Sequence, residues 1–253
     1  MFGATYAAIA TQPSLADLAK PFDNPAWWAI ESTSSLYVYT DKLDKLEGCR
    51  RTITIVPRLG ALVKQLKLNA KDEKLRAVVT EQLAELLDIQ KQEGVVGMPA
   101  AAELNEDIEA HPLSSKLEFP DIRDSINYSY HWSLRIIIAL LCQEARAHNL
   151  QLSGMPSLDE LSQEAWKCAK LISMTLPHLS SLSIQMAAGS LFPLQIAWVA
   201  SWRIQNIDSL AGDQRLRLLQ WLESNIARAA KLAGYTCSQA IPRNFAEALL
   251  DEQ

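Results

Sequence analysis

The residues best suited to chemistry lie in the stretch "INYSYHWSLRIIIALLC", residues 126–142. Asn127, His131 and Arg135 are spaced four residues apart, so a helix places them on one face. Amide, imidazole and guanidinium groups can donate hydrogen bonds to charge that develops on a reacting substrate. We therefore predict that His131, Arg135 and Tyr130 are catalytic residues. Asn127 is predicted to bind the substrate.

Aromatic side chains accompany this polar face. Tyr128 and Trp132 border it, and in a second apolar segment Gln195, Trp198 and Trp202 fall on one helical stripe. Aromatic walls with a few directed polar groups are the usual composition of a small-molecule site. Besides Asn127, the predicted substrate-binding residues are Tyr128, Trp132, Gln195, Trp198, Trp202 and Trp28.

Each of these residues also has a structural interpretation. Tryptophans four residues apart more often pack in a core than line a ligand site. A histidine such as His131 on an apolar helix more often makes a structural hydrogen bond. Arg135 needs a partner because its guanidinium stays charged. Asp121, Asp124 and Glu31 are the carboxylates considered for an ion pair, and a bound anion is the alternative.

Several classes of site have no support in the sequence. The four cysteines and four histidines are not spaced as metal-ligand pairs. Patterns for a P-loop, a dinucleotide-binding turn or a nucleophile elbow do not occur. We therefore expect neither a metal nor a cofactor. A net charge of −5 offers no basic surface for direct nucleic-acid binding. Apolar runs are too short to span a bilayer, so we expect a cytoplasmic protein.

The elements that must position these residues are helices almost throughout. Ser157 and Glu160 form a capping box, and Asn24 followed by Pro25 marks another helix start. The irregular segment 94–118 is predicted as a loop with one short helix around 103–110. Apolar periodicity predicts helices over 71–94, 122–149, 157–175, 180–207 (one or two helices, with a bend near Pro193) and 213–234.

These elements predict an all-α fold. The 253 residues are 49% hydrophobic, which is enough to bury a sizeable core. We predict a single domain over residues 1–253. In it, two central apolar helices, beginning near Ile122 and Ser190, are wrapped by amphipathic helices and enclose an internal cavity.

Two segments resemble a known family. "FPDIRDSINYSYHWSLRI", residues 119–136, is similar to a pattern F-P-x-[LI]-x-x-A-x-x-x-N-x-Y-x-x-[LF]-R-I in the C-terminal regulatory domain of fungal zinc-cluster transcription factors. "AAGSLFPLQIAWVAS", residues 187–201, resembles their segment around F-P-L-x-[VI]-A. The resemblance implies a helical domain with a cavity and an association with fungal secondary metabolism. The zinc-cluster cysteines and basic linker of those factors do not occur in this sequence, so DNA binding is not carried over.

Two functions stay open. The first is a cofactor-independent cyclase or isomerase, including the pericyclic Diels–Alder type, acting on an apolar secondary metabolite in an aromatic-lined helical pocket. Folding the substrate into a reactive shape and placing donors on developing charge would supply the catalysis. The second is a non-catalytic regulatory or ligand-binding module that works with a partner transcription factor, which would make the protein nuclear. A homodimer is a further option. We favour the enzyme, because a module without an output domain needs a partner.

Overall fold

The computed structural model describes residues 59–60, 62–63, 65–92, 101–103, 113, 115–119, 122–150, 152–179, 184–203 and 209–232. Within these ranges the chain is helical apart from one short pair of strands, which confirms the predicted all-α class. The predicted helix start at Asn24 and the candidate residue Trp28 lie outside the described residues.

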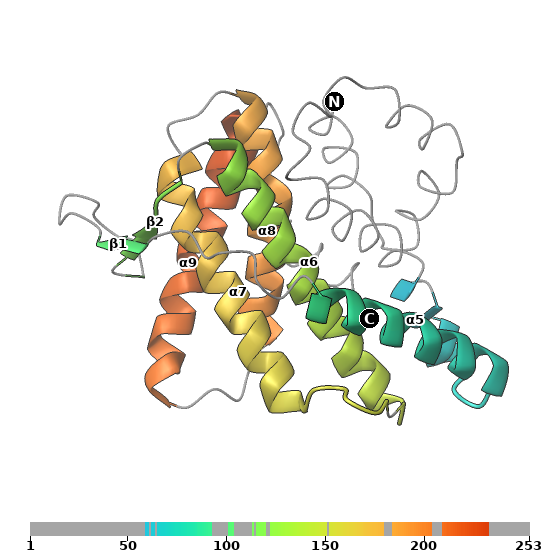
Figure 1. Ribbon diagram of the computed structural model, residues 1–253. Helices are drawn as coiled ribbons and strands as arrows, with labels where there is room; N and C mark the ends of the chain where they lie inside the picture. Colours follow the sequence, from blue (N-terminus) through green and yellow to red (C-terminus); the bar gives the residue numbers. More distant parts are fainter. Residues whose placement is uncertain are drawn as a thin grey trace, which may run out of the picture.

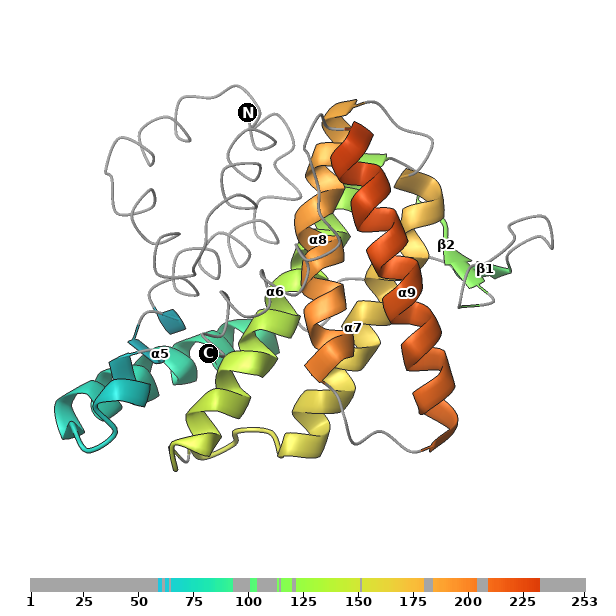
Figure 2. The same ribbon diagram turned by 180° about the vertical axis from the view of Figure 1, so that it is seen from behind.

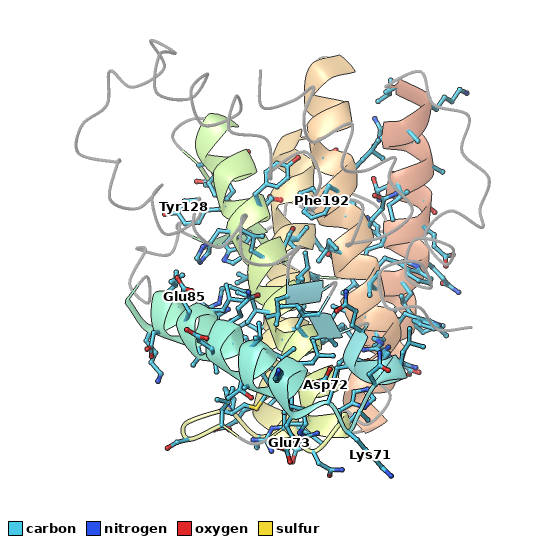
Figure 3. All side chains as sticks on the ribbon, turned by 90° about the vertical axis from the view of Figure 1, so that its right-hand side faces the viewer. Lys71, Asp72, Glu73, Glu85, Tyr128 and Phe192 are labelled. Carbon is cyan, nitrogen blue, oxygen red and sulfur yellow. The ribbon has the colours of Figure 1, made fainter. Side chains whose placement is uncertain are left out.

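Four helices form an upright bundle, and a fifth lies across it. The bundle helices pack side by side, and α5 crosses near the lower part of α6 (Figures 1 and 2). Figure 3 looks at the bundle from the side of α5 and shows Tyr128 and Phe192 above that helix. The five helices are α5 (Glu73–Gln92), α6 (Ile122–Ala147), α7 (Leu158–Leu179), α8 (Ile184–Arg203) and α9 (Ser209–Leu232).

The two apolar helices predicted as central are α6 and α8. Every side chain from 190 to 201 is buried, and the run Ile136–Cys142 of α6 is buried as well. Helix α8 packs against α6, α7 and α9, whereas α6 packs against α7, α8 and α5. Helices that are apolar all round need neighbours on every side, which explains their place in the core. The predicted internal cavity stays a prediction.

Helix α8 continues through Pro193 as a single helix. Proline removes one backbone hydrogen bond and crowds the preceding turn, which costs about 3 kcal/mol in an isolated helix. Here the packing of an entirely buried segment on three neighbouring helices offsets that cost. Of the one or two helices predicted for residues 180–207, the described part, Ile184–Arg203, therefore has one.

Local signals set several helix ends. The Ser157 side-chain oxygen accepts a hydrogen bond from the Glu160 backbone N–H at 3.2 Å, and the Glu160 carboxylate accepts one from the Ser157 N–H at 2.7 Å. This arrangement is the predicted capping box. The last helix, however, begins at Ser209 and not at the predicted residue 213. A glycine in the first turn, Gly212, does not prevent helix formation there.

The segment 94–118 differs from the prediction of a loop with a short helix. Strand β1 (Ala101–Glu103) pairs antiparallel with β2 (Ser115–Leu117), with Ala102 opposite Lys116. Glu103 is therefore in a strand and does not begin a helix. Ladders of three residues are too short for their periodicity to be recognised in a sequence. Strand β2 packs against α7 and buries Leu117.

Helices α6 and α7 approach closely through small polar side chains. Ser125, Ser129 and Ser133 of α6 are fully or almost fully buried and lie one turn apart. The Ser129 hydroxyl donates to the Ser125 carbonyl oxygen at 2.8 Å and lies 3.1 Å from the Thr175 hydroxyl of α7. Buried hydroxyls thus find partners without a large side chain between the two backbones. No helix in the described ranges is long and apolar enough to cross a membrane.

Candidate functional site

The charged candidate of α6, Arg135, forms an ion pair with a carboxylate of α7. The Arg135 Nη2 atom lies 2.7 Å from Oε1 of Glu164 on α7, and both side chains are about one third exposed, at 32% and 29%. Of the carboxylates considered in the sequence, Asp121, Glu31 and the side chain of Asp124 lie outside the described residues. A carboxylate on the neighbouring helix pairs with Arg135 because α6 and α7 pack along most of their length.

His131 lies one turn before Arg135 on the same helix and is half-buried. Its pKa is lowered from 6.5 to about 4, chiefly by burial and next by the charge of Arg135, while the charge of Glu164 acts in the opposite direction. The imidazole is therefore neutral at physiological pH. A neutral imidazole offers one N–H donor and one acceptor nitrogen, which suits hydrogen bonding better than proton exchange.

Cys168 extends this cluster on α7. Its thiol donates to the Oε1 atom of Glu164 at 3.3 Å. Burial, with the charge of Glu164, raises the Cys168 pKa far above its usual value, and burial raises the pKa of Cys142 to about 12. Both thiols therefore stay protonated and are poor nucleophiles. Among the described residues, no three His, Cys, Asp or Glu side chains are placed to hold a metal ion.

Tyr130 points toward α8. Its ring stacks on Phe192 of that helix, with centroids 5.8 Å apart and planes inclined by 15°. On a helix, Tyr130 and His131 diverge by about 100° because each turn holds about 3.6 residues. The structure therefore places the predicted catalytic Tyr130 in the α6–α8 interface, while Arg135 contacts α7.

Tyr128 and Trp132 belong to an aromatic cluster near the start of α6. Their ring centroids are 5.5 Å apart, and Phe119 lies 5.7 Å from Tyr128. Trp132 is 3% exposed, so it belongs to the core. Asn127 lies in the same part of α6, but its side chain is outside the described residues.

Of the candidate residues of α8, Trp198 contacts α9. The indole rings of Trp198 and Trp202 stack at 5.9 Å with an angle of 12°. The Trp198 Nε1–H donates to the Glu223 carboxylate of α9 at 3.1 Å. Gln195, one turn before Trp198, is 4% exposed, and its Oε1 atom has no hydrogen-bond partner in the described part of the chain.

The candidate residues thus lie against different neighbours. Arg135 contacts α7, Tyr130 contacts α8, and Trp198 contacts α9. The sequence did not predict the two carboxylates that contact Arg135 and Trp198, which are Glu164 and Glu223 respectively. A signal for Glu164 existed, because it falls one turn from the buried residues of α7.

The chain matches no protein-family model, no curated protein and no solved structure. The resemblance to fungal transcription-factor regulatory domains therefore depends on its two sequence segments alone.

Proposed function

We propose that the protein binds an apolar small molecule without converting it, as a regulatory or ligand-binding module that works with a partner transcription factor. The observation that carries the proposal is the ion pair between Arg135 and Glu164. Arg135 is one of the three residues predicted to act on charge that develops in a reaction, and Glu164 already neutralises it. A reaction that relied on Arg135 would first have to weaken this pair. The pair thus supports binding over catalysis.

The positions of the two family-like segments support the same proposal. Residues 119–136 contribute much of α6 and residues 187–201 much of α8, and these helices pack against each other. In the segments themselves, Phe192 stacks on Tyr130 and Phe119 packs on Tyr128. Motif residues that make helix contacts are expected if the resemblance reflects a shared regulatory-domain fold, which is part of this proposal.

A second candidate is a cofactor-independent cyclase or isomerase, including the Diels–Alder type, acting on an apolar secondary metabolite. The neutral state of His131 favours it, since the pKa of this half-buried imidazole is lowered to about 4. A fixed neutral donor can stabilise partial charge in a transition state without exchanging a proton. Such a reaction would need no nucleophile and no metal.

Ligand retention separates the two candidates. The purified protein is incubated with an apolar metabolite extract of its source organism, and retained compounds are identified by native mass spectrometry and liquid chromatography. Retention time is needed because cyclisation or isomerisation leaves the mass unchanged. A compound that is retained and released unchanged supports the module. A time-dependent new isomer, lost in His131→Phe, supports the enzyme, and failure to retain any compound contradicts both.

Deletion of the gene tests the regulatory part of the proposal. We expect lower transcript levels of genes that a zinc-cluster regulator controls, and a complex with that regulator in size-exclusion chromatography of the purified pair. Elution of a second copy of the chain in place of the complex would make the module a homodimer. Intact transcripts with loss of one late metabolite would contradict the module and support the enzyme.

A further inference from the structure

The Gln195 side chain has a buried amide oxygen that lacks a hydrogen bond among the described residues. Its side chain is 4% exposed, and its Oε1 atom has no hydrogen-bond partner in the described ranges. The other unpartnered buried atoms there belong to side chains that are only half-buried: Gln82, Arg135 and Arg146. A buried carbonyl oxygen without a donor is costly, because it has lost its hydrogen bond to water and gained none in return. A bound molecule that donates to Oε1 would recover this cost.

Two tryptophans lie on the side of α8 that carries Gln195. Trp198 and Trp202 follow Gln195 by three and seven residues, so the three side chains share one side of α8. The two indoles are stacked, and the hydrogen bond from Trp198 to Glu223 holds the first of them in place. Trp202 is half-buried, whereas Trp198 is 3% exposed. A flat ring of a ligand could therefore contact the partly accessible Trp202, while the Gln195 oxygen that accepts the hydrogen bond is more deeply buried.

The charged groups near the core favour an uncharged ligand. Arg203 donates to the Glu144 carboxylate at 2.6 Å, and Lys67 lies 3.2 Å from the other oxygen of that carboxylate. Arg135 is paired with Glu164. Each of these three cations already faces a carboxylate, so none of them calls for an anionic ligand. An ion buried beside Gln195 would lose its hydration without gaining an opposite charge from the stacked indoles.

We propose that Gln195 Oε1 accepts a hydrogen bond from the bound ligand, and that the ligand is an uncharged, flat aromatic molecule with a hydroxyl or N–H donor. This inference rests on the proposed ligand-binding function and specifies the chemical class of the ligand. The stacked indoles supply the apolar contact area, and the amide oxygen selects for the donor.

Two matched probes test the inference on the full chain. 1-Naphthol has a hydroxyl donor, and 1-methoxynaphthalene has the same ring system with the donor blocked. Isothermal titration calorimetry should show at least about fivefold tighter binding of 1-naphthol, because a net hydrogen bond contributes about 1 kcal/mol. In Gln195→Leu this preference should vanish. Gln220→Leu replaces an exposed glutamine of α9 and should keep it.

Equal affinities of the two probes for the wild type, or an unchanged preference in Gln195→Leu, would overturn the inference. Failure of both probes to bind would overturn it too, while the proposed function would still be decided by the metabolite experiment. If Gln195→Leu does not fold, the comparison of probes on the wild type and on Trp202→Ala decides. Trp202→Ala should weaken both probes and retain the preference for 1-naphthol.

Discussion

Helix α6 carries two charged side chains, Glu144 and Arg135, that differ in how completely their partners satisfy them. At Glu144, both carboxylate oxygens are engaged, one by Arg203 of α8 and the other by Lys67, and the Glu144 side chain is only 14% exposed. At Arg135, a single carboxylate is the partner, both side chains are about one third exposed, and the buried Nε atom has no partner among the described residues.

The difference indicates that Glu144 has a structural role, whereas the Arg135 pair is partly accessible to solvent. Burial raises the pKa of Glu144, but the hydrogen bonds and charges of Arg203 and Lys67 outweigh burial and lower its pKa overall. The carboxylate therefore stays ionised and connects three helical segments: α6, α8 and the helical residues 65–68. The Arg135 pair joins only two helices and lies next to the neutral His131.

Substitution of Glu144 should have the largest effect. Glu144→Gln leaves the positive charges of Arg203 and Lys67 largely buried without their carboxylate, so we expect a loss of about 3 kcal/mol in the free energy of unfolding. Urea denaturation followed by circular dichroism measures it. The matched control is Asp88→Asn, which removes an exposed pair with Lys91 and should change stability by less than about 0.5 kcal/mol. Equal effects would mean that the Glu144 pair is not structural.

Lowering the pH from 6.5 to 4 should destabilise the fold through His131. The folded-state pKa of about 4 lies below the ordinary 6.5, so the unfolded chain binds more protons in this window. The contribution of His131 to the free energy of unfolding is therefore fully present above pH 6.5. It falls by up to about 3 kcal/mol toward pH 4, at about 1.4 kcal/mol per pH unit. His131→Phe should flatten this dependence, whereas His148→Gln should not.

The free energy of unfolding should fall further below pH 4.5. In this range the unfolded chain binds a proton at Glu144 more readily than the folded state, in which the Glu144 pKa is lowered. Glu144→Gln should remove this acid limb and leave the one due to His131. A denaturation series in both variants would show whether the two limbs separate. If stability falls in a single step with decreasing pH, and Glu144→Gln alone abolishes that step, the loss between pH 6.5 and 4 is not due to His131.

Substitution of Arg135 should cost less than substitution of Glu144. Arg135→Gln removes a partly exposed pair, so we expect a loss of about 1–2 kcal/mol. The charge of Arg135 lowers the His131 pKa, so its removal should raise that pKa above about 4. An NMR titration of the His131 ring protons measures the change. Arg203→Gln is the control. An equal rise of the His131 pKa in that variant would show that His131 responds to the charges around Glu144 as strongly as to Arg135.

The smallest effect is expected at Lys67. Lys67→Met removes one of two cations from Glu144, and Arg203 keeps the closer contact. We expect a loss of about 0.5–1 kcal/mol, because the lysine side chain is 27% exposed and its charge is partly solvated. Urea denaturation of this variant, compared with Glu144→Gln, ranks the two contacts. A loss as large as that of Glu144→Gln would mean that Lys67 is the main partner.

Much of the fold was predictable from short-range patterns. The start of α6 at Ile122 and the capping box at Ser157 depend on neighbouring residues, and both predictions are confirmed. The strand pair at Ala101–Glu103 was not predictable in this way, since its partner lies beyond an irregular segment and its ladder is very short. Side-chain partners such as Glu164 depend on which helices pack together, and helix periodicity does not specify that.

By itself, the sequence determined that the chain is helical, where most helices lie, and which stretches are apolar enough to be central. Those properties follow from local propensity, caps and periodicity, which act within a few turns. Only the tertiary structure decided that Glu164 neutralises Arg135 and that Glu223 binds Trp198. It also decided that the Gln195 oxygen has no partner among the described residues. The physical reason is that a buried polar group is satisfied or left unsatisfied by the neighbouring helix, and that neighbour is set by packing.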